Sequence, residues 1–171
     1  SESEKRFPYR GYLVVTDIEG PISTPAFGGY SYVVHFTDMY SRFSVSYVMK
    51  NRKDVGKCFE RYITEYCEPR GVKIRKVQTD NAKEYVEKGR QFHKVARERS
   101  VRTRSNAPYC HLEQVAAERV IQRNTIIAFV YMAQRQLPVE YWGWCIEHVY
   151  RVTNLLPHSA FDLTDSPYCR W

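Results

Sequence analysis

Residues 72–81 read V-K-I-R-K-V-Q-T-D-N. Apolar side chains at Val72, Ile74 and Val77 lead to Asp80. This spacing predicts a strand over Val72–Thr79, with Asp80 at its end. Before it, residues 55–67 repeat apolar side chains at helical spacing, and Pro69 to Gly71 end that helix. A strand that follows a crossover helix can lie parallel beside the first strand of its sheet. The pattern therefore predicts a parallel pair within an α/β fold.

Three more strands are expected upstream of the helix. They are residues 12–18, 30–38 and 42–50, with Met39 to Ser41 as the turn of a hairpin. The first of them contains Val-Val-Thr-Asp and reaches Asp17 near its end. Short connections favour an antiparallel meander, and the crossover then brings Asp17 and Asp80 to neighbouring strand ends.

The remaining elements complete a β-β-β-α-β-α-β-α-α order. We expect a basic helix at 89–99, a strand at 101–105, helices at 112–136 and 142–156, and a loop or short docking segment at 166–171. This order predicts a five-stranded mixed sheet flanked by helices. We predict a flexible segment at 1–11 and one domain at 12–171, since 171 residues can enclose a core.

The charge distribution points to a polyanionic partner. The net charge is +7, and residues 70–104 hold twelve Lys or Arg against four acids. Nucleic acid is the first candidate, and a solvated basic face is the alternative. No apolar run is long enough to span a membrane. Five cysteines without a C-x-x-C favour reduced thiols in an intracellular protein over disulfides or structural zinc.

A third acid completes a candidate catalytic set. Residues 107–124 read A-P-Y-C-H-L-E-Q-V-A-A-E-R-V-I-Q-R-N and predict a helix that carries Glu118. Alone, Glu118 indicates no more than a solvated helix face. Together with Asp17 and Asp80 it supplies the carboxylates that a two-metal phosphoryl-transfer site needs. The alternative is three structural acids without metal.

At this point the chain resembles the catalytic cores of Copia-type retrotransposon integrases, which have the ribonuclease H-like (RNase H-like) fold. The motifs that carry the resemblance are T-D-x-x-G-P from Thr16, F-T-D-x-x-S-R-F from Phe36, T-D-N-x-x-E-Y from Thr79, P-Y from Pro108, A-E-R from Ala117, L-P-x-x-Y-W from Leu137, N-L-L-P from Asn154 and S-P-Y from Ser166. Each is weak alone, but all occur in order over one domain. Asp38 lies in the second motif and is interpreted as a structural cap or turn residue.

The sequence also departs from that family. Ala82-Lys83 replaces a Gly-rich pair, and His111 and Gln114-Val115 replace a Pro and an Asn-Gly before the glutamate. Loss of that glycine should stiffen the loop or extend the helix. The departures leave open a domesticated domain that acts as a DNA- or protein-binding module with little catalysis. Another nuclease of the same fold is a further alternative.

The resemblance implies DNA end processing and strand transfer in the nucleus, with two Mg²⁺ or Mn²⁺ ions. Asp17 would bridge both ions, and Asp80 and Glu118 would hold one each. The DNA partners would be the element ends and the target. The candidate DNA contacts are Lys83, Lys88, Arg90, Lys94, Arg119, Gln122 and Arg123.

The family also implies a homodimer or a higher oligomer, formed through the first long helix and the penultimate helices. Aromatic residues on the corresponding segments here are candidates for that interface. They are Tyr62, Tyr66, Tyr131 and the region of Trp142. The alternative is that these rings fill the core of the monomer. Trp144 is likewise interpreted as a core or interface residue and not as a base-stacking platform.

Overall fold

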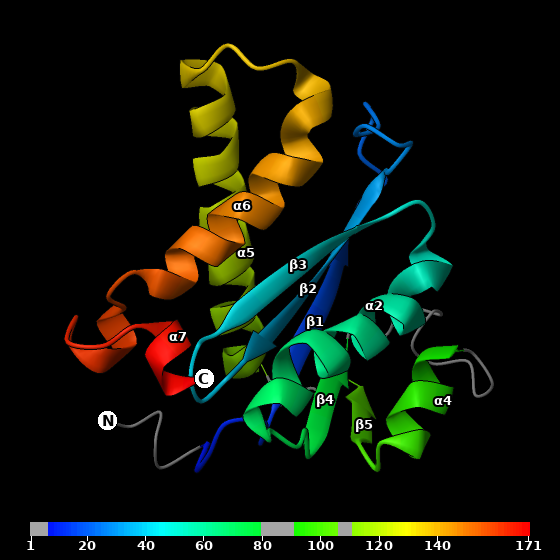
Figure 1. Cartoon of the computed structure of the whole chain (residues 1–171), viewed down its shortest axis with the longest axis vertical. Helices are drawn as coiled ribbons and strands as arrows, with labels where there is room; N and C mark the ends of the chain where they lie inside the picture. Colours follow the sequence, from blue (N-terminus) through cyan, green and yellow to red (C-terminus); the bar gives the residue numbers. More distant parts are fainter. Residues whose placement is uncertain (1–6, 80–90, 106–110) are drawn as a thin grey trace.

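The computed structural model describes residues 7–79, 91–105 and 111–171. Its centre is one five-stranded sheet in the order β3-β2-β1-β4-β5 (Figure 1). The strands are β1 (Val14–Glu19), β2 (Tyr32–Asp38), β3 (Ser44–Met49), β4 (Lys76–Thr79) and β5 (Arg102–Ser105). β1 to β3 are antiparallel neighbours, whereas β4 lies parallel to β1 and β5 parallel to β4. The predicted mixed sheet and the predicted meander are confirmed.

Helices cover both faces of the sheet (Figure 1). The described helices are α2 (Val55–Tyr62), α4 (Gln91–Glu98), α5 (His111–Gln134), α6 (Trp142–Leu155) and α7 (Pro167–Arg170), and α2 continues into a π-helical turn at Ile63–Cys67. Successive strand residues point to opposite faces. Val14 accordingly packs in the cluster of α2 and α4, and Val15 packs beside Ala117 of α5.

One strand is shorter than the sequence predicts. Val72 and Ile74 are both buried, at 7% exposure, but β4 begins only at Lys76. The backbone N–H of Val72 donates to the Cys67 carbonyl, and that of Arg75 donates to the Gly11 carbonyl. These hydrogen bonds join Val72 and Arg75 to residues outside the sheet and not to a neighbouring strand. Apolar spacing alone therefore made a buried loop look like the start of a strand.

The segment before β1 is held by Asp38. Its carboxylate is fully buried and accepts hydrogen bonds from Gly11 N at 2.8 Å and Ser41 N at 2.8 Å. Ser41 Oγ donates a third bond at 2.7 Å. The structural role predicted for Asp38 is confirmed. Phe7 is also buried, so packing begins before Tyr12, and residues 1–6 lie outside the described part of the chain.

The aromatic residues divide between core and surface. Tyr62 and Trp142 are fully buried, so the prediction that they form an interface is wrong for both. Their rings fill the two sides of the sheet, in the clusters of α2 and α6. Trp144, in contrast, is 57% exposed, so it is not a core residue, and its interpretation as an interface residue stays a prediction.

The end of the chain folds back onto the domain. α7 precedes Trp171, which is 2% exposed and stacks on Phe43 at 5.1 Å between ring centroids. The sequence predicts a helix at 142–156, but α6 ends at Leu155, and Leu156 after it is 52% exposed. Within the described residues, we find no helix with the length and hydropathy of a membrane span.

Candidate functional site

Asp17 lies on the side of the sheet that α5 covers. It is two residues from Val15, which packs with Ala117, and strand alternation puts both on one face. Ile18 packs in the cluster on the opposite face. Asp17 is half-buried, and its Oδ1 accepts the Ile18 backbone N–H at 2.9 Å. This bond orients the carboxylate and leaves its second oxygen for another partner.

Glu118 lies on a continuous helix. α5 starts at His111, so Gln114 to Ala117 belong to the helix. This agrees with the expectation that loss of the family's glycine extends the helix. Ala117 is buried against β1, and Ile121, one turn beyond Glu118, is 4% exposed. Glu118 therefore lies at the border of the buried stripe, with its own side chain exposed. The helix brings it to the same side of β1 as Asp17.

The third predicted acid cannot be placed. β4 ends at Thr79, and Asp80 lies outside the described residues, as do Lys83, Lys88 and Arg90. Within residues 7–79, 91–105 and 111–171, no three His, Cys, Asp or Glu side chains form a metal-binding group. The set of Asp17, Asp80 and Glu118 stays a prediction. Its donors are carboxylate oxygens, which suit a hard divalent cation.

The predicted DNA contacts that are described fall on two helices. Arg119, Gln122 and Arg123 are exposed along α5. Lys94 is exposed on α4, which packs with α2 on the opposite face of the sheet. The fold therefore groups the three α5 residues and does not bring Lys94 to them.

A row of polar side chains next to Asp17 was not predicted from the sequence. Across the sheet, Asp17 pairs with His35 and His35 pairs with Ser46. His35 is 1% exposed, stacks on Tyr150 at 5.2 Å, and its Nε2 lies 3.5 Å from Glu19 Oε2. Burial raises the pKa of Tyr150, with a smaller effect of Glu19. The alternation of side chains along β2 could have placed His35 on this face, but a single histidine in a strand does not by itself indicate a functional site.

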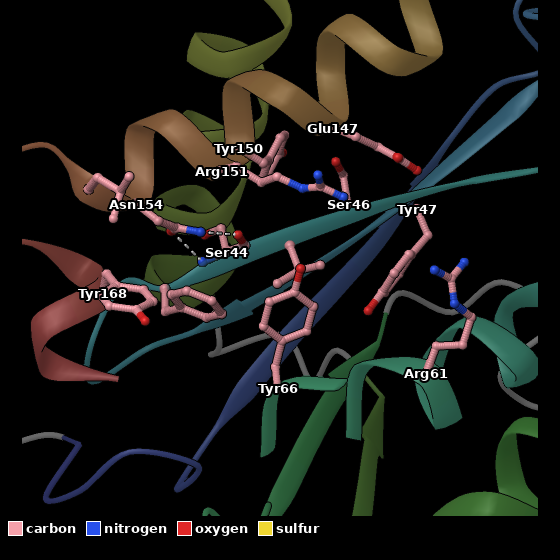
Figure 2. A pocket seen from close by; sticks show the side chains of 13 residues that line it. Ser44, Ser46, Tyr47, Arg61, Tyr66, Glu147, Tyr150, Arg151, Asn154 and Tyr168 are labelled. Atoms are coloured by element: carbon pink, nitrogen blue, oxygen red, sulfur yellow. Dashed lines mark hydrogen bonds between the residues drawn. The ribbon is translucent and has the colours of Figure 1, made fainter. Parts of the chain in front are cut away.

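A cavity of about 290 Å³ lies at the free edge of β3 (Figure 2). Asn154 of α6 spans this edge, since its Oδ1 accepts Ser44 N at 3.0 Å and its Nδ2 donates to Ser44 O at 2.7 Å. Glu147 accepts the Val48 N–H at 3.3 Å, and burial raises the pKa of its carboxyl. The cavity is mostly aromatic and apolar, with Arg61 and Arg151 at its sides.

A second cavity, of about 360 Å³, lies between α5 and the segment after α6. Its polar lining consists of Arg42, Arg119, Arg123, His158 and Ser159. Arg42 and His158 were not among the residues singled out from the sequence. They lie in different turns, far apart along the chain, and only the fold brings them together.

Comparison with known proteins agrees with this architecture. The integrase core domain family matches residues 9–111 of this chain. The retrovirus-related Pol polyprotein from transposon TNT 1-94 of Nicotiana tabacum is 27% identical over 157 residues, which are 90% of this chain and 12% of the polyprotein. The chain thus spans a small part of that relative.

A solved structure has the same fold. A chain of the simian T-cell lymphotropic virus intasome, in complex with PP2A regulatory subunit B56 gamma, superposes with a TM-score of 0.71 at 14% identity. The match covers 95% of this chain and 54% of the other. At this identity the likeness concerns the fold, which is ribonuclease H-like. The family match spans more than half of the chain and is joined by a retrotransposon relative, so the chain belongs to the integrase core domain family, as a retrotransposon integrase core.

Proposed function

We propose that this domain is a metal-dependent polynucleotidyl transferase that trims the ends of an element's DNA and joins them to target DNA in the nucleus. The observation that carries the proposal is the placement of Asp17 and Glu118 on the same side of β1. The family to which the chain belongs generally uses divalent metals.

Asp17, Asp80 and Glu118 would hold Mg²⁺ or Mn²⁺. A pair of such ions supplies activation of the attacking oxygen and stabilisation of the leaving oxygen. The chain's own contribution is to hold the carboxylates in place. β1 and the bond from Ile18 N fix Asp17, and the continuous α5 helix gives Glu118 a rigid base.

DNA is the proposed partner of the exposed surface of α5. Arg119, Gln122 and Arg123 lie exposed along the same helix as Glu118, and the net charge is +7. Positive side chains on the helix that carries Glu118 would hold the phosphate backbone while the carboxylates would hold the metal ions at one phosphodiester.

The domain is also proposed to act as a homodimer or a higher oligomer. The end of α6 exposes Val152, Leu155 and Leu156 at 40%, 60% and 52%. Leu155 also lines the cavity at the β3 edge, together with Tyr66 of the π-helical turn after α2 (Figure 2). Apolar protrusions next to an apolar cavity suit an isologous contact, in which each copy contributes both features. Of the interface aromatics predicted from sequence, Tyr66 and Tyr131 remain candidates.

Strand transfer tests the proposal. An oligonucleotide that carries an element end and Mn²⁺ should give joined products with wild type, and Glu118→Gln and Asp17→Asn should each lower the rate by at least about 100-fold. The matched control is Glu140→Gln, which changes a half-buried acid in the short 3₁₀ helix before α6 and should keep the wild-type rate.

The alternative is a domesticated binding module. If wild type and Glu118→Gln bind the oligonucleotide equally and neither joins it, the module is favoured. If Glu118→Gln joins DNA as fast as wild type, Glu118 is not a ligand and the assignment of the third acid is lost.

A further inference from the structure

We propose that the cavity between α5 and the segment after α6 is a phosphate-binding site, separate from the carboxylates of the proposed catalytic site. Its ligand is a phosphate anion, either a phosphodiester of a nucleic-acid backbone or a free polyphosphate. The inference extends the proposed DNA-binding function, because Arg119 and Arg123 are predicted DNA contacts.

The lining of this cavity is positively charged. Arg42, Arg119 and Arg123 surround about 360 Å³ of space, and no described carboxylate lines it. Among the residues that the structure describes, no ion pair within 4.0 Å joins these arginines to an acid. Asp38 acts on Arg42 through its charge, but its oxygens are bound to Gly11 and Ser41. Guanidinium groups match phosphate in geometry and charge.

His158 adds a donor to the arginines. Its Nδ1 accepts the Ala160 backbone N–H at 3.0 Å, so the neutral ring carries its proton on Nε2. Burial lowers the pKa of His158, and the charges of Arg123 and Arg42 lower it further. The fields of both guanidinium groups thus reach the imidazole. Ser159 brings a hydroxyl to the same lining, so every polar side chain there can donate.

The cavity faces away from the proposed acids. Ala116, Arg119, Val120 and Arg123 line it at i, i+3, i+4 and i+7, which is one face of α5. At 100° per residue, Arg123 lies about 140° around the helix from Glu118. A phosphate bound here is therefore not the phosphodiester that would react at the proposed carboxylate site.

Calorimetric titration with pyrophosphate at low salt tests the site. Wild type should bind one pyrophosphate per chain, and the double variant Arg119→Gln/Arg123→Gln should bind it about 100-fold more weakly, because two charge-assisted bonds are lost. Both arginines are exposed, so the variant should keep the wild-type melting temperature. Arg135→Gln, in the turn directly after α5 and outside the cavity, should bind like wild type. Equal affinity in the double variant and wild type, or no binding by wild type, would overturn the proposal.

A second measurement follows the titration of His158, which lines the cavity. In NMR titrations of wild type, pyrophosphate should raise the pKa of His158, because the bound anion stabilises the imidazolium. An unchanged His158 titration at saturating pyrophosphate would also overturn the site.

Competition with a duplex oligonucleotide identifies the source of the phosphate. If the backbone of DNA occupies the cavity, the oligonucleotide should displace pyrophosphate and should bind the double variant more weakly. If a free polyphosphate is the ligand, the oligonucleotide should bind both proteins equally and leave pyrophosphate in place. Either result supports the site. Asp17→Asn should lose strand transfer and keep pyrophosphate binding, so a failure of the proposed catalysis is distinguishable from a failure of this site.

Discussion

At the scale of single residues, Asp38 shows how one buried carboxylate fixes several backbone segments. Its two oxygens accept three hydrogen bonds, from Gly11 before β1 and from Ser41 in the turn after β2. The turn also carries Arg42 at a positive φ of 62°, which is an uncommon conformation for a side chain of this size. Asp38 therefore supports the backbone that brings Arg42 to the phosphate-binding site.

We expect Asp38→Asn to lower the free energy of unfolding by about 2–3 kcal/mol, because an amide NH₂ would face a buried N–H donor. Urea denaturation of both proteins measures the difference. Asp162→Asn is the control, since Asp162 is exposed at a φ of 53° and asparagine tolerates that conformation. A variant at position 38 as stable as wild type would show that the three bonds contribute little.

At the scale of elements, the contact between α2 and α4 depends on a glycine. A Cβ at Gly56 would lie 2.6 Å from Phe92 N and 2.7 Å from Gln91 Cβ. Alanine favours a helix over glycine by about 1 kcal/mol, whereas overpacking costs about 1–3 kcal/mol. Because the nearest atom belongs to the backbone, the cost of overpacking should exceed the gain in helix propensity.

Gly56→Ala is therefore expected to lower the melting temperature, with a net loss of up to about 2 kcal/mol. Thermal unfolding followed by circular dichroism checks this. Lys57→Ala, one residue further along α2, removes a 67% exposed side chain and should change stability by a few tenths of a kcal/mol. A higher melting temperature for Gly56→Ala would mean that α4 moves aside at little cost.

At the scale of the whole molecule, the proposed self-association depends on the apolar end of α6. Leu155→Asp places a charge at the proposed contact and should shift the protein to monomer in light scattering at high concentration. Leu163→Asp is the matched control, because Leu163 is 63% exposed in a turn and lies outside the cavity at the β3 edge. A wild-type protein that is monomeric at high concentration, or a Leu155→Asp variant that still associates, would contradict the proposed interface.

Much of the architecture could be predicted because its signals are local or depend on order. The apolar run that reaches Asp17 and the spacing of the first helix predict a meander followed by a parallel strand, and the structure has both. Val72 and Ile74 misled the prediction, because burial makes a loop as apolar as a strand. Arg42 and His158 were missed because their proximity arises only from tertiary packing.

The side chains of α6 that cover the edge of β3 also have a consequence for the order of synthesis. Asn154 and Glu147 follow their strand partners by 110 and 99 residues. A ribosome that has completed β3 must therefore add most of the domain before this cover exists. Until then the sheet exposes unpaired N–H and C=O groups, which can pair with the edge of another nascent chain. Premature termination before α6 would leave that edge open permanently. The last third of the sequence is therefore needed to cover the edge strand in the first third.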